Sequence, residues 1–255
     1  MPTITADVWA ALAIGGVSSA GLLVGAIAGS FTQVRHHRIA LGMSVGAGLL
    51  LAAVSLKVAV DVIRAAGPLA AAVCLVAGAA LFSGSNAMLA RFGAMHRKRC
   101  GECIQQPNES KHPGSGVAIA VGNALDVVPE ALILGVALQE RAAPLVLVTA
   151  LSLGNLPGAL SSATGMRAAG RSYTYILVVW GVIGIGVATA VAAGYVGFSS
   201  LSAWPLRLQA LGAGALLAMT AETMIPEAVH DSPRFSGLLA AFGFGLLLLV
   251  DATTR

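Results

Sequence analysis

The feature that most constrains this chain is a succession of apolar stretches, each long enough to cross a lipid bilayer as a helix. A membrane-spanning helix needs about 20 mostly apolar residues, since each residue rises about 1.5 Å through a hydrocarbon core of about 30 Å. Eight segments meet this requirement: 8–31, 39–63, 67–92, 115–139, 143–165, 171–196, 205–229 and 235–252. The sequence therefore predicts an all-α bundle of eight transmembrane helices that forms a single domain over residues 1–255.

The composition supports a membrane protein and argues against nucleic acid as a partner. Hydrophobic residues make up 57% of the chain and charged residues 10%, whereas a soluble domain carries about 25% charged residues. The net charge is +4, but the basic residues lie in short loops between apolar runs and form no continuous patch. The N-terminal sequence MPTITADVW lacks the basic region of a cleaved signal peptide, so we expect the first apolar run to remain as a span. The lipid bilayer is the expected partner, and the sequence leaves open whether the chain forms a homodimer.

Loop charges predict the orientation of the chain. Lysine and arginine accumulate in cytoplasmic loops. If the N-terminus lies outside, ten of the fifteen basic residues fall on the cytoplasmic side. We therefore predict a multi-pass protein of the plasma membrane (the bacterial inner membrane), with both termini outside and the long polar loop 93–114 in the cytoplasm.

The 31 glycines indicate close helix packing, because small residues let backbones approach each other in a bilayer. Three groups of closely spaced glycines are candidate contact faces. They are Gly25 with Gly29, Gly42 with Gly46, and Gly181 with Gly184 and Gly186.

The fourth span carries two acids where charge is expensive. A carboxylate at mid-bilayer costs about 2.5–3.5 kcal/mol on insertion scales, so such residues usually face a cavity or a partner. Asn123, Asp126 and Glu130 follow the spacing i, i+3, i+7, which places them on one face of a helix. Pro129 removes a backbone hydrogen bond and is expected to leave a bend and a free carbonyl. These oxygens suit a cation; the alternative is an acid pair neutralised by protons or by Lys57.

The fifth span repeats this arrangement with Ser152, Asn155 and Pro157. Counted from the outer ends of the two spans, Asp126 and Asn155 lie at similar depths, about 18–20 Å into the membrane. We therefore expect Asn155 to complete the cation site, with Ser152 as an outer contact. The alternative for Asn155 is an interhelical hydrogen bond with no ligand role.

The seventh span ends in a further polar group. Glu222 lies deep enough to join the site, and Pro226 is expected to free its carbonyl. Glu227 and His230 lie nearer the cytoplasmic end. They are either pathway residues or solvated residues of the interface.

Three segments resemble the Zrt/Irt-like (ZIP) family of divalent-metal transporters. They are Asp126-Val-Val-Pro-Glu130 in the fourth span, Gly154-Asn-Leu-Pro-Gly158 in the fifth and Glu222-Thr-Met-Ile-Pro-Glu227 in the seventh. The resemblance implies eight spans, a metal site between the fourth and fifth spans, and transport by movement of one helix bundle against another. It also implies a transported ion of the zinc, iron or manganese class, with Asp126, Glu130, Asn155 and Glu222 as ligands.

The chain departs from the family motifs at positions that bind metal in the family. Asp126 stands where the family has histidine, Val127 where it has asparagine, Gly158 where it has glutamate, and Thr223 where it has an acidic residue. All five histidines lie in or beside loops, so the site offers oxygen ligands alone. Such ligands suit harder ions such as Mn²⁺ or Mg²⁺ better than Zn²⁺, and we expect reduced zinc selectivity.

The loop 93–114 contains a second group of metal-binding residues, His96, Cys100, Cys103 and His112. A Cys-x-x-Cys pair is half of a common zinc site. The alternatives are a disordered loop with reduced cysteines and a redox pair.

The sequence contains no nucleophile–base arrangement and no phosphate-binding loop, so we expect a transporter without catalytic cofactors and not an enzyme. The alternatives are a transport-inactive ZIP-like scaffold or sensor, and a carrier of protons or organic cations.

Overall fold

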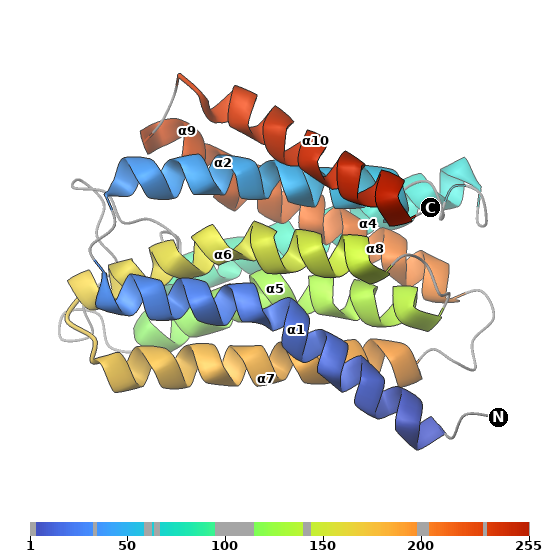
Figure 1. Ribbon diagram of the computed structural model, residues 1–255, viewed down its shortest axis with the longest axis horizontal. Coiled ribbons are helices and arrows are strands. Elements are labelled where there is room, and N and C mark those ends of the chain that lie inside the picture. Colours follow the sequence, from blue (N-terminus) through green and yellow to red (C-terminus); the bar gives the residue numbers. More distant parts are fainter. Residues whose placement is uncertain are drawn as a thin grey trace.

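The computed structural model describes residues 4–32, 35–58, 63, 67–94, 115–139, 144–197, 204–231 and 234–254. Every secondary-structure element within these ranges is a helix (Figure 1). The α-helices are α1 (Ile4–Phe31), α2 (His36–Ala53), α4 (Pro68–Leu89), α5 (Ser115–Gln139), α6 (Pro144–Ala168), α7 (Tyr173–Gly197), α8 (Trp204–Met219), α9 (Ile225–Asp231) and α10 (Ser236–Thr254). Three π-helical turns extend or join them: η1 (Val54–Val58), η2 (Ala90–Ala94) and η3 (Thr220–Met224).

The predicted all-helical architecture is confirmed. Among the described residues, eight helices are long and apolar enough to cross a membrane, and each falls on one of the eight predicted segments. The seventh of these combines α8, η3 and α9. Many large apolar side chains point outward, such as Leu69 and Val76 on α4 and Leu238 on α10. An outer surface of this kind suits lipid, because proteins in water rarely expose large contiguous apolar patches.

The helices pack in two groups. In the first group α1 packs against α6 and α7, and α5 packs against α7. In the second, α4 packs against α8, and α2 packs against α9 and α10. The groups meet where α2 contacts α6 and where α5 contacts α8. Figure 1 shows α1 and α7 at one edge of the bundle, α10 at the opposite edge, and α6 between α1 and α2.

Helix α6 is held between two glycine faces. On α1, a Cβ atom added at Gly21, Gly25 or Gly29 would overlap the carbonyl oxygen of Ser152, Leu156 or Leu160 respectively. On α2, a Cβ at Gly46 would lie 2.5 Å from the Gly154 oxygen, and one at Gly42 would lie 3.2 Å from Cβ of Pro157. The predicted contact faces at Gly25 and Gly29 and at Gly42 and Gly46 are therefore confirmed, and they fix the position of the helix that carries Asn155.

The predicted glycine face of α7 is wrong in part. A Cβ added at Gly184 would touch Leu23, but nothing lies within 4 Å of one added at Gly181 or Gly186. The glycine that α7 uses for close packing is Gly194, which meets Leu132 and Gly135 of α5. Glycine spacing alone does not show which side of a helix meets a neighbour, and this explains the error.

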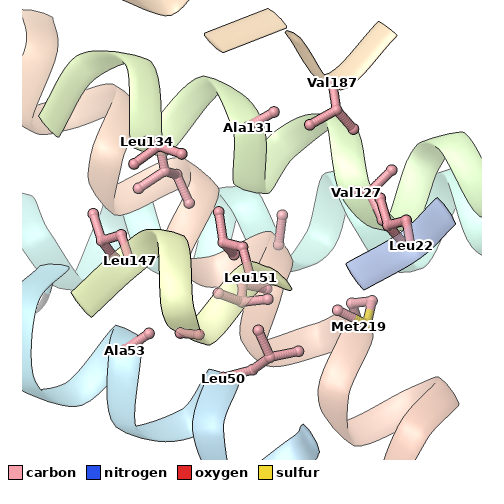
Figure 2. Close-up of a cluster of buried hydrophobic side chains, with 14 of the residues drawn as sticks. Leu22, Leu50, Ala53, Val127, Ala131, Leu134, Leu147, Leu151, Val187 and Met219 are labelled. Atoms are coloured by element: carbon pink, nitrogen blue, oxygen red, sulfur yellow. The ribbon is translucent and has the colours of Figure 1, made fainter. Parts of the chain in front are cut away.

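The apolar core joins the two groups. Figure 2 shows part of this core, in which side chains from six helices lie close together. The labelled residues are Leu22 of α1, Leu50 and Ala53 of α2, Val127, Ala131 and Leu134 of α5, Leu147 and Leu151 of α6, Val187 of α7 and Met219 of α8. All are buried. The face of α5 that carries Asn123, Asp126 and Glu130 therefore has close-packed apolar residues beside it.

The first described turn of α1 and the last turn of α10 lie at the same end of the bundle (Figure 1). This agrees with an even number of spans.

We expect a membrane-impermeant maleimide to label the loop cysteines Cys100 and Cys103 in inverted vesicles and not in intact spheroplasts. A Cys74→Ser variant keeps only these two cysteines. Labelling in intact spheroplasts would show that the loop faces outward.

The glycine packing of α6 predicts that Gly25→Ala destabilises the protein. The added methyl group would meet the backbone of Leu156, which cannot rotate away, and overpacking of this kind costs about 1–3 kcal/mol. Gly16→Ala is the matched control, because the same helix has open space there. Thermal unfolding of the purified variants in detergent should show a lower Tm for Gly25→Ala alone. Equal Tm values would contradict the close approach.

Candidate membrane-embedded cation site

Two polar stripes face each other where α5 meets α6. Asn123 on α5 donates from Nδ2 to Oγ of Ser162 on α6 at 2.8 Å. About two helical turns further along, Asn155 on α6 donates a hydrogen bond from Nδ2 to the carboxylate of Glu130 on α5. The two residues of each stripe are seven positions apart, Asn123 and Glu130 on α5 and Asn155 and Ser162 on α6, and the pairs run in opposite directions. The two hydrogen bonds therefore set the antiparallel register of α5 and α6.

The polar side chains of this face are withdrawn from both lipid and water. Asn123, Asp126 and Glu130 are each 2% exposed, and Asn155 is 5% exposed. The three α5 residues thus lie on one buried side of their helix. Burial of a carboxylate needs partners in compensation, because an isolated ionised group in an apolar medium is very costly. The bundle interior therefore holds two acids together with the amide groups of two asparagines.

A small cavity lies at the middle of the facing stripes. Its volume is about 10 Å³, close to the smallest space that holds one water molecule. Its walls come from the four helices of the first group: Leu22 of α1, Asn123, Asp126 and Val127 of α5, Asn155, Gly158 and Ala159 of α6, and Trp180 of α7. The register places the small residues Gly158 and Ala159 opposite Asp126. The cavity therefore exists because the α6 residues opposite Asp126 have small side chains or none.

The proline of α5 faces a different neighbour. Helix α5 is continuous from Ser115 to Gln139 with Pro129 inside it. Pro129 lines a separate apolar cavity of about 240 Å³ between α4, α5 and α8, together with Leu125, Leu132 and Ile133. Asp126 faces the interior of the first helix group, whereas Pro129 faces the junction between the groups. The α5 segment thus connects the buried acids to the surface along which the two groups meet.

Glu222 is placed apart from this buried site. Its carboxylate accepts a hydrogen bond from the Ser83 hydroxyl and another, at 3.0 Å, from Nδ2 of Asn86. Both partners belong to α4, and the Glu222 side chain is exposed. Glu222 lies in the π-helical turn η3, where the Ile225 N–H donates to the carbonyl of Thr220, five residues earlier. Glu222, Ser83 and Asn86 therefore form a second polar cluster, which lies in the second helix group.

The other predicted site residues have different surroundings. The Ser152 hydroxyl accepts a hydrogen bond from the Gly21 N–H at 3.1 Å, and thus joins α6 to α1. Glu227 is buried on α9, whereas His230 on the same helix is exposed. The loop residues His96, Cys100, Cys103 and His112 lie outside the described residues, as does the side chain of Lys57.

Sequence reasoning did not identify two residues of the site. Ser162 was detectable in principle, because it follows Asn155 by seven residues and so shares its helix face. Trp180 lies within a long apolar helix and is 2% exposed. Its position beside Asp126 depends on the packing of α7 against α5, which the sequence does not encode locally.

The donor set suits a hard cation. Among the described residues, no three His, Cys, Asp or Glu side chains converge into one metal-binding group. A metal ion at this level would draw on the two carboxylates of α5 and on amide oxygens, as hard cations accept. The sequence matches no model of a known protein family and no characterised protein.

The buried Asn155–Glu130 hydrogen bond predicts a stability difference between two asparagines. Asn155→Ala removes a donor from a buried carboxylate and should cost about 1.5–3 kcal/mol. Asn86→Ala removes a donor from the exposed carboxylate of Glu222 and should cost less than about 1 kcal/mol. Equilibrium unfolding in mixed micelles, followed by circular dichroism, measures both. A larger loss for Asn86→Ala would contradict the assignment of Asn155 to the buried site.

Proposed function

We propose that this protein is a secondary transporter that carries divalent metal cations, of the zinc, iron or manganese class, across the plasma membrane into the cytoplasm without ATP. The observation that carries the proposal is a pair of carboxylates, Asp126 and Glu130, buried among amide groups inside a bundle of membrane-spanning helices. Ionisable residues at such depth are expensive and usually mark a substrate or ion pathway.

The proposed ligands are the oxygen atoms of Asp126, Glu130 and Asn155, with Asn123 beside them. Asp126 and Asn155 line the same cavity, and Asn155 also contacts Glu130, so one cation can meet oxygens from both helices. Glu222 takes a different part in this proposal. Its carboxylate lies on the second helix group with Ser83 and Asn86, and serves as a separate acidic position on the pathway.

The resemblance to the ZIP family supports the same function and shows where this chain differs. Gly158, which replaces the family's fifth-span glutamate, lines the cavity beside Asp126. The proposed site therefore lacks one carboxylate at the position facing Asp126, and one ion with few protein ligands fits it better than two bridged ions. Alternating access, which the resemblance implies, would move the first helix group against the second along the α2–α6 and α5–α8 contacts.

Two other functions compete with metal transport. A transport-inactive scaffold or sensor would keep the fold and the buried acids but show no flux. A carrier of protons or organic cations would use the same acids, and metal ions would not compete with its substrate.

Flux measurements test the proposal. In liposomes containing the purified protein, ⁵⁴Mn²⁺ uptake should fall at least about tenfold in Asp126→Asn and in Glu130→Gln, since each removes a ligand charge worth about 1.4 kcal/mol or more. Asp251→Asn is the matched control, because Asp251 is buried on α10 and lies outside the site. Glu222→Gln should have an intermediate effect, as expected of a pathway residue.

Competition within the same assay separates the alternatives. Oxygen ligands predict that excess Zn²⁺ inhibits ⁵⁴Mn²⁺ uptake no better than excess Fe²⁺. Strong preference for zinc would contradict the proposed ligand chemistry. Flux that is unaffected by removal of either acid would exclude the site, and the absence of any metal flux would favour the scaffold.

A further inference from the structure

Two residues that line the cavity beside Asp126, Trp180 and Asn123, each have a buried polar atom without a hydrogen-bond partner among the described residues, one a donor and the other an acceptor. Nε1 of Trp180 and Oδ1 of Asn123 are both buried, and neither has a hydrogen-bond partner within the described protein. Both side chains are 2% exposed and line the cavity. A buried polar group left without a partner costs about 1–3 kcal/mol, so native structures rarely keep one. The pair therefore indicates a ligand that completes both hydrogen bonds.

The chemistry of the two atoms selects the ligand. An indole Nε1–H can only donate, and an amide oxygen can only accept. A bare cation would satisfy Asn123 and Asp126 but would face the positive end of the Trp180 N–H bond. A water molecule both accepts and donates, and the cavity of about 10 Å³ has room for one.

We propose that Trp180 holds a water molecule at the site and that a divalent cation bound there keeps this water as a ligand. This inference rests on the proposed transport function. One lone pair of the water oxygen binds the metal and the other accepts the Trp180 N–H. The water protons are directed toward Asn123 Oδ1 and the Asp126 carboxylate. Trp180 is thus a specificity-determining residue that favours ions carried with part of their hydration shell.

The apolar side of the same cavity keeps the number of retained waters small. Leu22 and Val127, which lie side by side in Figure 2, close this side together with Ala159. None of these side chains offers a hydrogen bond. A fully hydrated ion would not fit, so the space admits no more than the one water that the proposal assigns to the ion.

Pulsed electron paramagnetic resonance on Mn²⁺-loaded protein in D₂O tests the inference. The site-bound signal is the Mn²⁺ fraction that disappears in Asp126→Asn. We expect that fraction to show the deuterium coupling of a directly coordinated water. In Trp180→Phe, Mn²⁺ affinity should fall about tenfold, since a hydrogen bond worth about 1.4 kcal/mol is lost. Trp9→Phe is the matched control, because Trp9 is 71% exposed on α1.

The outcomes separate this inference from the proposed function. Site-bound Mn²⁺ without a coordinated exchangeable water, or unchanged Mn²⁺ affinity in Trp180→Phe, would overturn the inference and leave the transport proposal standing. Absence of any Mn²⁺ signal dependent on Asp126 would overturn both.

A second measurement remains informative if Trp180→Phe fails to fold. In ¹⁵N-tryptophan-labelled protein with Trp9 and Trp204 replaced by phenylalanine, the one remaining indole N–H should show a cross-peak to a bound water. Mn²⁺ should broaden that indole signal. Absence of the water cross-peak would overturn the inference.

Discussion

The close approach of α6 to α1 and α2 determines the geometry on which the buried site depends. Gly21, Gly25 and Gly29 recur every four residues on α1 and bring its backbone against the carbonyl groups of α6. In a bilayer, apolar surface gives little net drive for association, because lipid tails are as apolar as leucine. Contact between backbones then contributes through dispersion and through weak Cα–H···O interactions. With two sides of α6 occupied by glycine faces, its polar stripe is turned toward α5.

The polar stripe in turn specifies how α5 lies along α6. Apolar contacts between aliphatic side chains specify this register less sharply, because the hydrophobic effect has no direction. The pairs Asn123–Ser162 and Asn155–Glu130 fix it, since a shift of one turn would break both hydrogen bonds at once. Residues to which the proposed function assigns ligand oxygens thus also hold the register of the two helices. Helix position and site geometry have a common cause.

The sequence predicted the positions of the helices better than it predicted which helices pack against each other. Run lengths located all eight long apolar helices, because the thickness of the hydrocarbon core is a strong constraint on length. Helical spacing placed Asn123, Asp126 and Glu130 on one face, and a count of residues placed Asp126 and Asn155 at one depth. Spacing does not show which helix lies opposite a given face. For this reason, the sequence did not predict the partners of Glu222 on α4 or the position of Trp180 in the cavity wall. It also did not predict the π-helical turns η1, η2 and η3.

The cavity beside Asp126 depends on the small residues of α6 that line it, Gly158 and Ala159. The register of α5 and α6 brings Gly158 to the wall of the cavity, on the side that faces Asp126. A glutamate side chain there would fill the space and add a negative charge facing Asp126. With glycine, the space is open and the local negative charge is lower. The unpaired polar atoms of the lining residues are then the amide oxygen of Asn123 and the indole N–H of Trp180. In the proposed site, a water molecule in this space would supply the oxygen ligand that a glutamate at residue 158 would otherwise supply.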